Sequence, residues 1–152
     1  MANKFFPVSI DLNNKNILIV GAGKIALRKV KTLLDYNCNI TVITKEIFEE
    51  NFFELEKENK IKIIKNQEFE EKFLVNIFLV VVATDNEVLN DKISKLCMSK
   101  NILVNNISSK DEMNLRFSAI YEKDDIQIAI SANGNPKKAV DIKNKIKDIF
   151  KS

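Results

Sequence analysis

Histidine is absent from this chain of 152 residues. It is the side chain that most often acts as a general base, activates a nucleophile or binds a transition metal near neutral pH. Its absence argues against a triad hydrolase and against a histidine-based metal site. We therefore predict no metal centre.

Arginine and cysteine are also scarce. The only arginines are Arg28 and Arg116, and 24 basic residues are offset by 21 acidic ones. Because no long basic run is present, no nucleic-acid partner is predicted. Cys38 and Cys97 stand alone in apolar contexts, which favours buried free thiols over a disulfide or metal ligands. No signal-peptide core or membrane-length apolar run is evident, so we expect a cytoplasmic protein without a membrane partner.

Strands and helices alternate through the first two thirds of the chain. Apolar runs predict strands at 17–20, 39–44, 61–65, 78–84 and 102–106. Helical spacing predicts helices from residue 24 to about 37, over 46–59 and around 89–97. This order predicts an α/β fold with a Rossmann-like parallel sheet.

The pattern changes near residue 113. Two strand-like runs, "LRFSAIYE" (115–122) and "IQIAIS" (126–131), are joined by "KDD", which predicts a β-hairpin. Asn135 and Pro136 then suit the cap and first position of a terminal helix. We predict an NAD-binding Rossmann-like domain at 1–112. A C-terminal β-hairpin plus helix segment at 113–152 is predicted to serve dimerisation and the substrate site.

Glycine occurs three times, and Gly21 and Gly23 share the turn after the first strand. In the fingerprint G-x-G-x-x-A, the first glycine permits the turn and the second leaves room for a pyrophosphate beside the backbone. Ala26 takes the third, small position. The helix amides that follow can bind the phosphates. A plain tight turn is the alternative, but the context favours dinucleotide binding.

The position that would contact the ribose is less definite. An acid at the end of the second strand often binds the 2′-hydroxyl of NAD, and this place reads Thr44, Lys45, Glu46. Glu46 could accept from a ribose hydroxyl, or Lys45 could meet the 2′-phosphate of NADP. We favour NAD and leave NADP open.

Four ordered segments resemble one family, the dehydrogenase domain of sirohaem synthase, which also occurs as a stand-alone precorrin-2 dehydrogenase. They are "FPVSIDLNNKNILIVGAGKIALRKVKTLL" (6–34), "VVATDNEVLN" (81–90), "ILVNNIS" (102–108) and "RFSAIYEKDDIQIAISANGNP" (116–136). The resemblance implies NAD-dependent oxidation of precorrin-2 to sirohydrochlorin in sirohaem biosynthesis.

The same resemblance assigns expected roles to individual residues. The pyrophosphate is expected at Gly21, Ala22, Gly23, Lys24 and Ile25, the ribose at Lys45 and Glu46, and the nicotinamide at Thr84 and Asp85. The carboxylate-rich tetrapyrrole requires cations or hydrogen-bonding groups, for which the candidates are Arg116, Asn133, Lys137 and Lys138. A surface salt bridge is the alternative role for Arg116.

One departure from the family concerns the catalytic acid. The family's acid after its "V-N-V-V" motif aligns with Ser108, whose hydroxyl is a poor base without a histidine to activate it. Asp111 could reach the crevice if its loop folds back, and a solvated or capping role is its alternative. We keep Asp111 and Ser108 as the catalytic candidates. These changes leave oxidation plausible and argue against iron chelation.

The resemblance further implies a homodimer in which the hairpin segment pairs across a two-fold axis; packing on its own domain is the alternative. Two other functions stay open. One is a non-catalytic dinucleotide or tetrapyrrole sensor that has lost the catalytic acid. The other is a different small Rossmann reductase.

Overall fold

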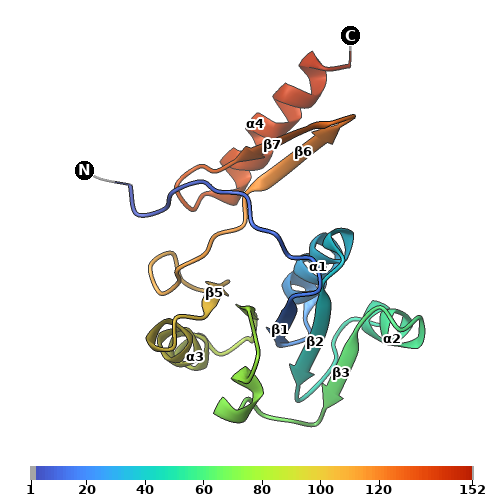
Figure 1. The fold of residues 1–152 in the computed structure, drawn as a ribbon, viewed down its shortest axis with the longest axis vertical. Coiled ribbons are helices and arrows are strands. Elements are labelled where there is room, and N and C mark those ends of the chain that lie inside the picture. The colour runs from blue at the N-terminus through green and yellow to red at the C-terminus, as the bar shows by residue number, and fades with distance from the viewer. Residues whose placement is uncertain (1–2, 152) are drawn as a thin grey trace. The chain divides into compact units, whose positions relative to one another are not determined.

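The computed structural model describes residues 3–151 and divides them into two compact units, with the division after Leu115. The first unit carries a parallel five-stranded sheet, and the second carries a two-stranded antiparallel sheet with one helix (Figure 1). This confirms the predicted fold class. Within residues 3–151, no helix is both long and apolar enough to cross a bilayer.

The five strands of the first unit are ordered β3-β2-β1-β4-β5. Their bounds are β1 Asn16–Val20, β2 Asn39–Thr44, β3 Lys62–Lys65, β4 Leu79–Val82 and β5 Leu103–Asn106. The interior strand β4 is buried along its whole length, as its unbroken apolar run predicts for a strand covered on both faces. The helical elements between the strands are α1 Lys24–Leu33, η1 Leu34–Tyr36, α2 Asn51–Lys57, η2 Glu71–Leu74 and α3 Glu87–Ser99.

Helix α2 is shorter than predicted, because the expected helix over 46–59 begins only at Asn51. The Thr44 hydroxyl donates to the Glu46 carbonyl, and the Phe48 amide donates to the Ala22 carbonyl at 3.1 Å. These bonds hold residues 45–49 as a loop beside the glycine turn. The helix predicted from the spacing of Phe48 is therefore wrong at this residue, whose side chain is exposed.

The end of the first unit lies three residues beyond the predicted boundary at 112. Met113 is buried, and the Leu115 amide donates to the carbonyl of Val104 on β5. Asn114 accepts from the Val104 amide and donates to the Ile102 carbonyl. These contacts attach 113–115 to β5, so the strand predicted from 115 begins only at Ala119.

The second unit contains β6 Ala119–Lys123, β7 Ile126–Ile130 and α4 Pro136–Ile149. The hairpin pairs Lys123 with Ile126. The Asn135 side chain accepts from the Lys138 amide, and Pro136 opens the helix, as predicted. Helix α4 packs on the hairpin within this unit, where the rings of Tyr121 and Phe150 lie 5.7 Å apart.

Both cysteines are free thiols, as predicted. Cys97 is buried, and burial raises the pKa of its thiol to about 11. Cys38 is only half-buried, so the expectation of burial holds less fully there.

Candidate functional site

A topological switch point lies between β1 and β4, because the chain leaves β1 toward β2 and β3 and returns to β4 and β5. In open α/β sheets, ligands bind outside the carboxyl ends of the strands at such a point. Val20 and Val82 end the two strands in register. The Ala83 amide then donates to the Val20 carbonyl at 2.8 Å. The segments that leave β1 and β4 therefore start in contact.

Gly21 is required by that contact. Its φ is +108°, a conformation that side chains rarely adopt, and a Cβ there would lie 2.3 Å from the Ala83 carbonyl oxygen. Its amide donates to the Ile43 carbonyl at 2.9 Å, which joins the turn to β2 as well. Any side chain at this position would push β1 and β4 apart.

Gly23 serves a different purpose, because a Cβ placed there would meet nothing within 4 Å. It is the N-cap of α1, and no side chain caps the amides of that first turn. By contrast, Asn86 and Asn135 cap α3 and α4 through their side chains. The first turn of α1 also contains no acid. This helix end therefore combines open space with the positive end of the helix dipole, which suits a phosphate.

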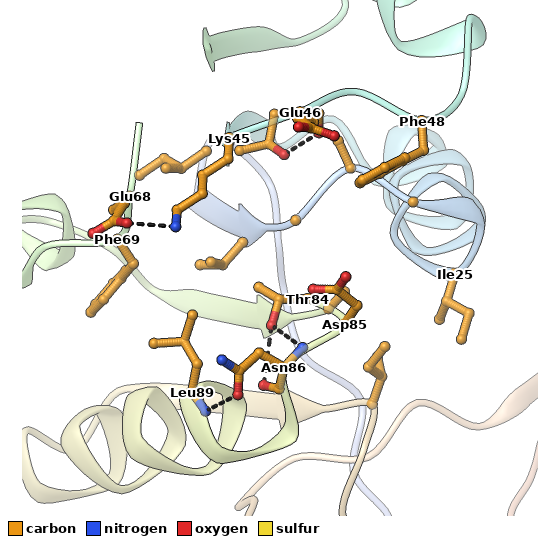
Figure 2. Close-up of a pocket in the computed structure, with 18 of the residues that line it drawn as sticks. Ile25, Lys45, Glu46, Phe48, Glu68, Phe69, Thr84, Asp85, Asn86 and Leu89 are labelled. Atoms are coloured by element: carbon orange, nitrogen blue, oxygen red, sulfur yellow. Dashed lines mark hydrogen bonds and ion pairs between the residues drawn. The ribbon is translucent and has the colours of Figure 1, made fainter. Parts of the chain in front are cut away.

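A pocket of about 800 Å³ lies over these strand ends (Figure 2). The nine residues predicted to bind the cofactor all line it: Gly21, Ala22, Gly23, Lys24, Ile25, Lys45, Glu46, Thr84 and Asp85. The fold thus brings three separate sequence segments to one pocket. Their individual contacts with a cofactor stay predictions.

The loops after β2 and β3 supply one side of the pocket. The Lys45 ammonium lies 2.5 Å from a Glu68 carboxylate oxygen (Figure 2). Both side chains are largely exposed. The pair raises the pKa of Lys45 and lowers that of Glu68, so both groups are charged at neutral pH.

The loop after β4 supplies the opposite side. Thr84 donates from its hydroxyl to the Asn90 side-chain oxygen, and its amide donates to the same oxygen at 3.3 Å. The Asn90 amide group donates to the Thr84 carbonyl and to the Ser108 hydroxyl, each at 3.0 Å. Asn90 is fully buried. It therefore couples the loop at Thr84 to the segment that follows β5.

The two catalytic candidates lie after β5, and neither lines this pocket. The Ser108 hydroxyl donates to Asn106 Oδ1 at 2.9 Å while it accepts from Asn90. Its single proton is thus engaged within the protein. Asp111 is exposed; its amide donates to the Ser109 hydroxyl, and its carbonyl accepts from Lys4.

The four predicted substrate contacts, Arg116, Asn133, Lys137 and Lys138, all belong to the second unit. Asn133 has a φ of +48° in the turn before α4. Lys137 and Lys138 occupy the first turn of α4, and both are exposed. Arg116 is half-buried at the start of the unit.

Several pocket residues escaped the sequence analysis: Phe48, Gln67, Glu68, Phe69, Asn86, Leu89 and Ile107. Asn86 and Leu89 could have been found, since both follow "ATD" and belong to a recognisable helix cap. The Gln67 to Phe69 stretch had no local pattern to mark it. It reaches the pocket only because β3 pairs with β2.

A dinucleotide fits these residues. The pocket offers a glycine turn that excludes side chains, an uncapped helix start and open space at Gly23. A family model described as "Putative NAD(P)-binding" matches residues 8–119. The chain belongs to this family. The match covers most of the chain and confirms the predicted type of cofactor.

Comparisons with curated proteins point to one group within this NAD(P)-binding family. The chain is 37% identical over 130 residues to the siroheme synthase of Mannheimia succiniciproducens and 35% identical to that of Buchnera aphidicola. Each match covers 86% of this chain but 27% of the relative. The chain therefore spans about a quarter of the length of the curated relatives it matches.

A solved structure extends the likeness. The precorrin-2 dehydrogenase SirC matches with a TM-score of 0.80 and 27% identity, over 95% of this chain and 70% of SirC. The resemblance expected from the four motifs is thus confirmed.

Proposed function

We propose that this chain oxidises precorrin-2 to sirohydrochlorin with NAD as the electron acceptor. The observation that carries the proposal is the extent of the likeness to SirC. It covers 95% of the chain, more than the first unit of 115 residues out of 152 provides. The match thus includes residues of the hairpin unit, which a generic dinucleotide-binding sheet lacks.

NAD, when bound, supplies the site for the hydride that leaves the substrate. The chain's own task is to hold NAD and precorrin-2 in the relative orientation that hydride transfer requires. The α1 amides and the open space at Gly23 suit the diphosphate. We propose that Thr84 and Asp85 flank the nicotinamide. Thr84 is held in place by its hydrogen bond to the buried Asn90.

The substrate's carboxylates require cations, and we assign this role to Arg116, Lys137 and Lys138, with Asn133 as a hydrogen-bonding partner. Arginine can bind a carboxylate through two parallel hydrogen bonds, whereas lysine acts as a point charge. We therefore expect the loss of Arg116 to weaken substrate binding more than the loss of either lysine or of Asn133.

The proton-transfer group is assigned to Asp111. Ser108 is a weaker candidate because its hydroxyl already donates to Asn106. The sequence also contains no histidine that could activate this hydroxyl as a base. The same lack of a carboxylate at 108 argues against iron chelation at this site.

We also propose a homodimer formed through the second unit. A two-stranded hairpin is marginal alone, and α4 supplies its packing within the unit. Ile126 on β7 is 44% exposed and Val140 on α4 45% exposed, so apolar surface remains for a second copy. Light scattering at micromolar concentration is expected to give the dimer mass, and a monomer mass would contradict it.

Free thiols fit a reducing compartment, and we place the reaction in the cytoplasm.

The test of the reaction is NADH formation after anaerobic addition of fresh precorrin-2 and NAD, followed by absorbance. Arg116→Ala is expected to raise the substrate KM by at least about tenfold, the loss of one charged hydrogen-bonding group, with NAD affinity unchanged. Asp111→Asn is expected to lower kcat, whereas Ser108→Ala leaves it near the original value. If the unmodified chain binds both ligands yet forms no NADH, it is a sensor and not an enzyme.

A further inference from the structure

The residue at the end of β2 does not select the cofactor by itself. An acid at this place would accept from the ribose hydroxyls of NAD, but the position holds Thr44. Thr44 is 6% exposed, and its hydroxyl is committed to the Glu46 carbonyl. The next residue, Lys45, is a cation suited to a 2′-phosphate. Taken alone, Lys45 would favour NADP.

The neighbouring strand brings a carboxylate to that cation. β3 pairs with β2 so that Lys65 lies opposite Thr44. Asn66 then adopts a positive φ of +54°, and the Gln67 amide donates to the Thr44 carbonyl at 3.2 Å. This turn places Glu68 against Lys45 (Figure 2).

The position of Glu68 is supported by its own loop. The Gln67 side chain donates to the Glu68 carbonyl at 3.0 Å and to the Glu70 carboxylate at 2.9 Å. The loop is therefore held by hydrogen bonds on both sides of Glu68. The backbone that carries Glu68 is therefore fixed beside Thr44, the neighbour of Lys45.

The charges around the pocket point the same way. Its lining contains two lysines, Lys24 and Lys45, and three carboxylates, Glu46, Glu68 and Asp85. The charges of Lys45 and Glu68 cancel in their ion pair. The carboxylate of Glu46 therefore gives the side of the pocket formed after β2 and β3 a net negative charge. A 2′-phosphate carries close to two negative charges near neutral pH, whereas a 2′-hydroxyl is neutral and can donate to a carboxylate.

We propose that Glu68 is the residue that selects NAD over NADP. Its carboxylate pairs with the Lys45 ammonium, accepts hydrogen bonds from the ribose hydroxyls and repels a 2′-phosphate. This inference rests on the proposed function, because it assumes that the pocket holds the adenosine half of a dinucleotide beside β2. It adds a specificity-determining residue from β3, outside the glycine fingerprint.

Glu68→Gln tests the inference because it keeps the shape of the side chain and removes its charge. The measurement is the dissociation constants of NADH and NADPH, from calorimetry and from nicotinamide fluorescence, at low and high salt. The unmodified chain is expected to favour NADH. Glu68→Gln is expected to tighten NADPH binding by about tenfold, the lower end for a charged hydrogen bond, and salt should weaken that gain.

Two further variants show whether the gain passes through Lys45. In Glu68→Gln with Lys45→Ala, the improved NADPH binding should disappear, because no cation is left to meet the phosphate. Glu58→Gln is the matched control: Glu58 forms a similarly exposed pair with Lys60 and does not line the pocket. It should leave both dissociation constants unchanged.

The outcomes separate this inference from the proposed function. An unchanged NADH to NADPH ratio in Glu68→Gln, or a gain that persists without Lys45, overturns the role of Glu68. A chain that prefers NADPH from the start, or that binds neither dinucleotide, also overturns it. If the ratio shifts as expected but precorrin-2 is not oxidised, Glu68 keeps its role and the proposed reaction fails.

Discussion

The glycine wall of the pocket, residues 21–25, works through backbone, whereas the β2–β3 wall, residues 45–46 and 67–69, works through side chains. On the glycine wall, a single added carbon at Gly21 would meet a carbonyl at 2.3 Å. On the β2–β3 wall, Lys45 and Glu68 have side chains 67% and 72% exposed. A side chain at Gly21 therefore disturbs the fold, whereas a change at Lys45 or Glu68 can alter ligand preference while the fold stays the same.

This difference has a physical origin. Gly21 lies where two central strands leave the sheet, so its geometry is shared with β4 and β2. An exposed ion pair has little effect on stability, because water and salt screen it and two long side chains must be ordered. Stability and specificity therefore reside in different walls of one pocket.

The largest effect is expected for Gly21→Ala. The added Cβ requires both a rare backbone conformation and displacement of the Ala83 carbonyl, together costing on the order of 3 kcal/mol of the free energy of unfolding. Urea denaturation measures it. Gly23→Ala is the control, with open space and a φ of −95° that alanine accepts, and as an N-cap change it should lose at most about 1 kcal/mol. Equal losses in both variants would contradict the contrast between the two glycines.

Gly23→Asp is expected to abolish NAD binding while the fold is retained. The open space at Gly23 admits the side chain, but its carboxylate would lie where the diphosphate is expected and would repel it. We expect at least about a hundredfold loss of affinity, close to 2.8 kcal/mol. Calorimetry on the folded variant measures this, with Glu58→Gln, which lies outside the pocket, as the comparison. Unchanged affinity would remove the phosphate site from this turn.

Lys29, on the α1 side, contrasts with Lys45. Burial, with a smaller contribution from Arg28, lowers the pKa of Lys29 to about 8. The unfolded chain, with its lysine pKa near 10.5, therefore binds more protons between pH 8 and 10.5, and stability should rise with pH through that window. Lys29→Met should stabilise the chain by on the order of 2 kcal/mol at pH 7.

The gain from Lys29→Met should fade as the pH rises through 10.5, because above that pH the lysine is neutral in both states. Denaturation curves across this range measure the difference. Lys31→Met, an exposed lysine on the same helix, should show no comparable pH-dependent difference. A constant advantage for Lys29→Met at every pH would show that packing, not charge, causes it.

The smallest effect is expected for the stability of Glu68→Gln and Lys45→Ala. Since both side chains are exposed, the thermal midpoint should stay within experimental error of the original chain. Calorimetric melting without ligand checks this. A clear drop in Tm for either variant would mean that the β2–β3 wall also supports the fold, and the comparison between the two walls would fail.

Much of the architecture could be predicted from local pattern. The unbroken apolar run of β4 predicts a central strand, and the "NGNP" stretch predicts the start of α4, because burial and capping depend on neighbours in sequence. Phe48 shows where this reasoning fails. Its spacing with Phe52 is helical, yet its backbone bonds to Ala22, a contact between residues far apart in the sequence.

The glycine turn could be predicted from the residues alone, because a backbone position that excludes a side chain is filled by glycine, and this chain has few glycines. The surroundings of Lys45 could not be predicted in this way, because they depend on contacts between segments far apart in the chain. Glu68 lies 23 positions later, and it meets Lys45 through the register of β3 on β2 and the turn at Asn66. Register arises from pairing between strands, so no local pattern in either strand records which side chains will meet beyond their ends.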